Sequence, residues 1–195
     1  MAGRILLAAV LSAVLMFVWG FVFWGVLDMG SSLLQPLPAE LDVLAALRRA
    51  QVPSGMYVYP LPVDPKDQQA FEAAKAKHEE GPLLQLAYQS QGGPVMPLSQ
   101  LAQGLGHHFA IALLTGCLVA LAVRGLPGFG SRLIFILLMS LIASLWTNVG
   151  DVVWWFHSPR YCLGLVGYEM GMGLLMGLVT AAIVRPSPEE NALHP

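Results

Sequence analysis

Residues 5–27 read ILLAAVLSAVLMFVWGFVFWGVL, an apolar run in which Ser12 is the only polar side chain. A hydrocarbon core about 30 Å thick needs about 20 apolar residues in a helix, so this run is long enough to cross a membrane. Trp19 and Trp24 lie towards its far end, where aromatic side chains collect at a membrane interface. No small-residue cleavage site follows. We therefore predict a retained signal anchor over residues 1–27.

Three further apolar segments lie within residues 99–185, at about 104–123, 133–156 and 161–184. Of the 195 residues, 56% are hydrophobic and 11% are charged, whereas soluble domains average about 25% charged residues. The sequence therefore predicts an all-α membrane bundle of four transmembrane helices. The connections 124–132 and 157–160 are short, which predicts that the second, third and fourth helices are sequential antiparallel neighbours.

Basic residues near the helix ends predict the orientation, because they are in excess on the cytoplasmic side. Arg160 is the only one close to a membrane end on one side of the predicted bundle. Four lie on the other side: Arg4, Arg124, Arg132 and Arg185. We therefore expect both termini to be cytoplasmic, with residues 186–195 as a cytoplasmic tail, in the inner membrane of a bacterial cell. Residues 28–98, between the first two helices, are then extracytoplasmic, in the periplasm of a Gram-negative bacterium.

Residues 28–98 are the only predicted water-facing region large enough to fold, and they predict a small α/β cap. Leu41, Leu44 and Leu47 have helical spacing, and Asp64 with Pro65 is typical of a helix start. Short runs rich in strand-forming or alternating residues separate and follow the helices. The predicted elements are a helix at 38–48, a strand at 56–59, a helix at 66–80 and a strand at 83–88.

Five polar residues fall at about the same depth in the predicted bundle: His107, His108, Asn148, Asp151 and Glu169. Polar groups in a membrane carry a free-energy cost and mark either a site or an internal network. Three alternatives remain open. The cluster is a structural network, a site for a small ligand such as a lipid or quinone head group, or a metal or haem site using His107, His108, Asp151 and Glu169.

Glycines on the fourth predicted helix form two GxxxG pairs, Gly167 with Gly171 and Gly173 with Gly177. Such pairs allow close helix packing, and these two lie on nearly opposite faces. We expect one face to pack within the bundle. The other is available to a cofactor, a lipid or another subunit.

Several function classes are disfavoured. The net charge is -2 with scattered basic residues, which argues against nucleic-acid binding. Cys117 and Cys162 form no CxxC motif. No arrangement of nucleophile and base is recognisable, so enzymatic activity is not expected, and the sequence indicates no particular cofactor.

The chain resembles a group of small bacterial inner-membrane proteins of unknown function. The resemblance is carried by the tryptophan-containing anchor and by four runs: VPSGMYVYP at 52–60, EGPL at 80–83, PLS at 97–99 and AAIVRP at 181–186. It implies the four-helix architecture and no activity.

The leading hypothesis from the sequence is a non-enzymatic accessory or structural subunit of a larger membrane complex. Its expected partners are the lipid bilayer and other membrane protein subunits. The alternative is a membrane protein that binds a small ligand or a metal at the five-residue polar cluster.

Overall fold

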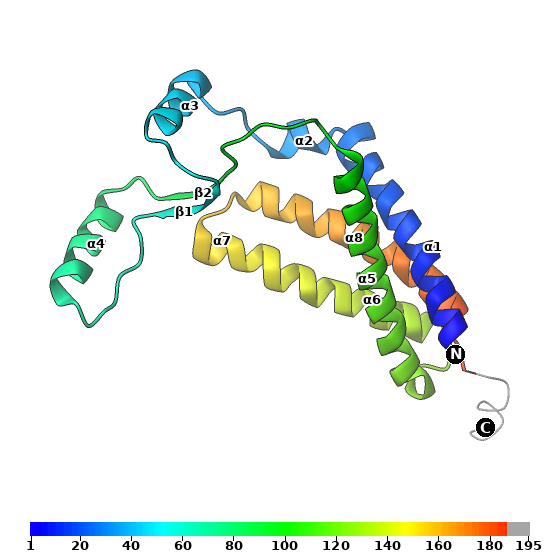
Figure 1. Cartoon of the computed structure of the whole chain (residues 1–195). Coiled ribbons are helices and arrows are strands. Elements are labelled where there is room, and N and C mark those ends of the chain that lie inside the picture. Colours follow the sequence, from blue (N-terminus) through cyan, green and yellow to red (C-terminus); the bar gives the residue numbers. More distant parts are fainter. Residues whose placement is uncertain (187–195) are drawn as a thin grey trace. The chain divides into compact units, whose positions relative to one another are not determined.

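The computed structural model describes residues 1–186; residues 187–195, most of the predicted tail, lie outside the described part. The chain forms two compact units (Figure 1). One is a helical bundle of residues 1–35 and 96–186, and the other comprises residues 36–95.

Four helices of the bundle are long and apolar enough to cross a membrane, as predicted. α1 (Ala2–Phe21) continues through a π-helical turn, Val22–Val26, and the short α2 (Met29–Leu33) follows it. α6 (Phe129–Ser144) continues through a second π-helical turn, Leu145–Val149, into α7 (Gly150–Trp155). The other two long helices are α5 (Leu98–Ala122) and α8 (Pro159–Ile183).

The order in which the helices pack differs from the prediction. α5 packs on α1, α1 on α8, and α8 on α6, whereas α5 and α6 touch at few positions and diverge from their connection (Figure 1). The predicted pairing of the second and third helices is therefore wrong over most of their length. A short connection brings two helix ends together but does not fix the angle between the helices, which here follows from packing on α1 and α8.

Arg132 joins the α5–α6 connection to the end of α8. Its side chain is buried, with 4% of its surface exposed. Nε donates to the carbonyl of Ala181 at 3.0 Å, and Nη1 donates to those of Leu126 and Pro127 at 2.9 and 2.7 Å. The last carbonyls of a helix carry partial negative charge, which favours a cation there. We call this end of the bundle the arginine end, and the end where Leu98 and Pro159 lie the cap end.

Three of the four glycines in these pairs pack inside the bundle, whereas Gly167 is exposed. A Cβ on Gly173 would lie 2.5 Å from Ser140 Oγ, and one on Gly177 would lie 2.8 Å from Leu133 Cδ1, so this pair packs on α6. On the other face, a Cβ on Gly171 would lie 2.7 Å from the indole ring of Trp19 on α1. At these three positions a larger residue would force the neighbouring side chains to move, because the helices approach closely.

Residues 36–95 form a two-stranded sheet with two helices. The elements are α3 (Glu40–Arg49), β1 (Gly55–Tyr59), α4 (Gln68–Glu80) and β2 (Leu84–Tyr88). β1 and β2 pair antiparallel, with Tyr57 opposite Leu86. The predicted order of helix, strand, helix and strand is confirmed.

The predicted cap of α4 is wrong by three residues. Asp67 is the N-cap, because its Oδ1 accepts a hydrogen bond from the backbone N–H of Ala70 at 3.0 Å. Asp64 instead accepts from the backbone N–H of Lys66 at 2.9 Å. Aspartate forms this local turn as readily as it caps a helix, so the sequence alone does not separate the two roles.

Candidate ligand-binding cavity

A cavity of about 570 Å³ lies inside the bundle, where α5 and α6 diverge. Side chains of α1, α5, α6 and α8 line it, together with Thr147 from the π-helical turn. His107, Ala143 and Thr147 are lining residues that are also exposed, so the cavity opens on the surface of the bundle. Its volume falls within the range of about 300–1,000 Å³ that is typical of small-molecule sites.

The lining changes from polar to apolar along the helices. His107 and His108 on α5 and Glu169 on α8 lie nearest the cap end. Further towards the arginine end the lining includes four methionines: Met16, Met139, Met172 and Met176. Glu169 and Met176 are seven residues apart, which is about 10 Å along a helix. The cavity is therefore amphipathic: its ionisable side chains lie at one end, and the lining towards the other end is mainly apolar, with hydroxyl groups at Thr115 and Ser140.

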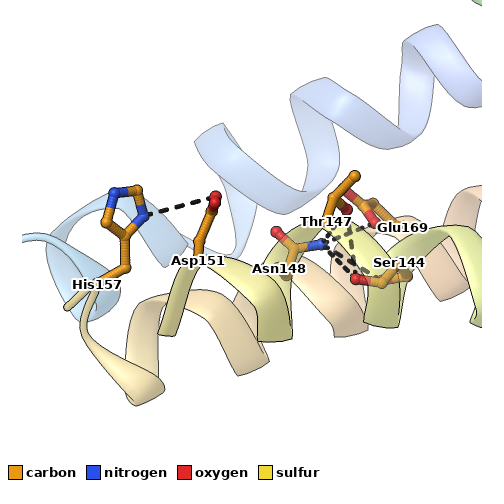
Figure 2. A network of polar contacts seen from close by, with 6 residues as sticks. All are labelled: Ser144, Thr147, Asn148, Asp151, His157 and Glu169. Carbon is orange, nitrogen blue, oxygen red and sulfur yellow. Dashed lines mark hydrogen bonds and ion pairs between the residues drawn. The ribbon is translucent and has the colours of Figure 1, made fainter. Parts of the chain in front are cut away.

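Glu169 accepts a hydrogen bond from Asn148, which lies on the neighbouring π-helical turn (Figure 2). The buried Asn148 donates through Nδ2 to Glu169 Oε2 at 3.0 Å and to the carbonyl of Ser144 at 3.0 Å. Thr147 Oγ1 donates to the carbonyl of Ala143 at 3.0 Å and accepts from Asn148 Nδ2 at 3.3 Å. Amide donors stabilise a carboxylate at this position and hold its orientation.

The π-helical turn Leu145–Val149 positions this network. Each extra residue in a helical turn rotates the following side chains by about 100°. π-helical turns within α-helices are often found at functional sites. Here the turn contains Asn148, which contacts α8, and Thr147, which lines the cavity.

The two predicted histidines both line the cavity. Their ring centroids are 5.5 Å apart with the planes at 45°. His108 is half-buried in a T-shaped arrangement with Phe17, and its Nδ1 is buried without a hydrogen-bond partner. A polar atom in that position favours a ligand that supplies the missing bond.

Asp151 does not line the cavity, although its sequence position suggested the same cluster. Phe156 has a left-handed backbone (φ 58°) at the end of α7, and the backbone N–H of His157 returns to the carbonyl of Asp151 at 3.2 Å. This helix-ending turn brings His157 Nδ1 within 3.7 Å of Asp151 Oδ2 (Figure 2). The predicted cluster is therefore divided: His107, His108 and Glu169 line the cavity, Asn148 holds Glu169, and Asp151 pairs with His157.

Among residues 1–186, no three His, Cys, Asp or Glu side chains lie close enough together to hold a metal ion. The imidazole and carboxylate set that the metal alternative requires is not assembled in this part of the chain.

The sequence did not identify Thr147, Ser140 or Tyr168 as lining residues. Met172 and Met176 stand out beside the glycines, but methionine is common in bundle cores and gives no functional signal by itself. Only the helix arrangement shows that they share a cavity with the histidines.

Comparison of the chain with family models, with curated proteins and with solved structures finds no match.

Proposed function

We propose that this chain is an integral membrane protein that binds a small amphipathic ligand, such as a lipid or quinone, in the cavity between α5 and α6. The observation that carries the proposal is the 570 Å³ cavity, polar at His107, His108 and Glu169 and apolar towards the methionines. An apolar cavity with a few polar groups at one end is typical of sites for small molecules.

The opening of the cavity supports entry of the ligand from the lipid. The exposed lining residues His107, Ala143 and Thr147 lie on two diverging helices. An amphipathic molecule already dissolved in the bilayer reaches them without crossing water. The ligand's head group would then lie among the polar groups at the cap end and its tail towards the methionines.

Filling the opening tests the proposal. Ala143 is an exposed lining residue, so Ala143→Phe places a ring in the cavity with little effect on the core. After purification in mild detergent, we expect mass spectrometry to find a stoichiometric small molecule with the wild type and at least tenfold less with Ala143→Phe. Ala110→Phe is the control, because Ala110 is exposed on α5 and does not line the cavity. Equal retention by all three proteins would contradict the proposal.

The accessory subunit favoured by the sequence is the second candidate. Part of its support is a second close-packing glycine face on α8, but Gly171 packs on Trp19 and the pair Gly173 and Gly177 packs on α6. Gly167 still favours it, because it is exposed and a Cβ there would have no atom within 4 Å. The same purification discriminates the two candidates. Stoichiometric protein partners without a small molecule would favour the subunit.

We also propose an inner-membrane location with cytoplasmic termini and residues 36–95 in the periplasm, on the distribution of arginines. Gly3→Cys and Gln69→Cys test it, since both positions are exposed and Gln69 lies on α4. Cys117 and Cys162 are first replaced by alanine. In intact spheroplasts we expect a membrane-impermeant maleimide to label residue 69 at least tenfold more than residue 3. Labelling of residue 3 alone would reverse the orientation.

A further inference from the structure

Glu169 lines the cavity with its carboxylate, and no cationic side chain of the described part of the chain forms an ion pair with it. In residues 1–186 no nitrogen of Lys, Arg or His lies within the 4.0 Å that defines an ion pair with its carboxylate. Its side-chain hydrogen bond comes from the neutral amide of Asn148. A carboxylate at membrane depth is costly unless it is paired or protonated.

The basic side chains in the remaining lining are His107 and His108, and neither lies within ion-pair distance of the Glu169 carboxylate. The lining contains no lysine and no arginine. The one amide that reaches Glu169 is already shared with the carbonyl of Ser144 and with Thr147 Oγ1, whose own proton goes to the carbonyl of Ala143. The region around the carboxylate therefore has a surplus of acceptors, which matches a ligand that brings N–H donors and positive charge.

We propose that the ligand is an amphipathic organic cation whose ammonium group pairs with Glu169 and whose apolar body extends along the methionines. This inference rests on the proposed function and specifies the chemistry of the ligand. The distance of about 10 Å from Glu169 to Met176 accommodates an aryl or alkyl body of a few carbon atoms. Thioether side chains adapt to such bodies and contact aromatic rings favourably.

Phenylbutylamine and phenylbutanol form a matched pair of probes. They differ in the head group, which is a charged donor in the amine and a neutral hydroxyl in the alcohol. Binding is measured by calorimetry to the protein in phosphatidylcholine nanodiscs, with empty nanodiscs subtracted for partitioning into lipid. For the wild type we expect the amine to bind at least tenfold more tightly than the alcohol.

Glu169→Gln removes the charge and keeps an oxygen that accepts from Asn148. In this variant we expect the amine to lose its tenfold advantage while the alcohol binds as before. If both probes bind the wild type equally, the proposal of a cationic ligand is wrong and a neutral ligand occupies the cavity. If neither probe binds and Ala143→Phe changes no retained molecule, the proposed function fails as well. The comparison of probes on the wild type needs no variant, so a folding defect in Glu169→Gln leaves the test intact.

Discussion

Replacing Arg132 by methionine is expected to lower the free energy of unfolding by about 3 kcal/mol, because hydrogen bonds to charged groups contribute roughly 1.5–3 kcal/mol each and part of the loss is offset by burying methionine. The guanidinium donates to the carbonyls of Leu126 and Pro127 in the α5–α6 connection and to that of Ala181 near the end of α8. Without it, three carbonyls at the arginine end lose their donor, and the connection separates from α8. Unfolding in detergent micelles, followed by circular dichroism during titration with sodium dodecyl sulfate, measures the change.

Arg124→Met is the matched control. Arg124 is exposed and lies in the same region of the chain, so we expect a change of about 0.5 kcal/mol or less. Arg132→Lys separates charge from geometry, since an ammonium group keeps the charge but lacks the planar fork that reaches carbonyls on two elements. An intermediate loss is expected for lysine. Equal stability of Arg132→Met and Arg124→Met would show that the observed hydrogen bonds do not stabilise the bundle.

The sequence predicted the elements of this fold better than their arrangement. The four spans follow from the length and apolar character of their segments, and the small sheet follows from runs such as Met56–Tyr59. The packing neighbours of each helix were harder to predict than the helices themselves. The α5–α6 connection is short, yet these helices diverge, because burial of Ala112 and Val119 places α5 against α1. A bundle of four apolar helices has several packing orders that bury similar side chains, and hydropathy does not distinguish them.

Only part of the candidate site could be predicted from the sequence, for a related reason. His107, His108 and Glu169 were selected by depth, which depends only on the rise per residue, and all three line the cavity. Asp151 has a similar depth but points elsewhere, because the left-handed Phe156 brings His157 to it. The π-helical turn at Leu145–Val149 has no recognisable sequence signal, although it sets the direction in which Asn148 points. Depth is predictable from a helical sequence, whereas direction depends on local departures from the regular helix.

Gly171→Leu is expected to destabilise the bundle by about 3 kcal/mol, the upper part of the range for overpacking a close contact. A Cβ at this position would lie 2.7 Å from the Trp19 indole, whose Nε1 donates to the carbonyl of Tyr168 at 3.0 Å. A larger side chain therefore displaces the indole and breaks that bond. Trp19 also packs on Phe23, and Phe23 packs on Tyr168, so the displacement extends through this aromatic group.

Gly167→Leu isolates the packing contribution, because residue 167 lies one turn earlier on α8 and a Cβ there would have no atom within 4 Å. Both substitutions replace glycine by a good helix former and gain similar helix propensity, about 1 kcal/mol at most. Their difference therefore measures the contact with Trp19. The same titration gives the free energies of unfolding, and tryptophan fluorescence reports the indole environment. If the two leucine variants are equally stable, α1 does not pack on this face of α8 in the membrane, and the glycine face is again available to a partner subunit.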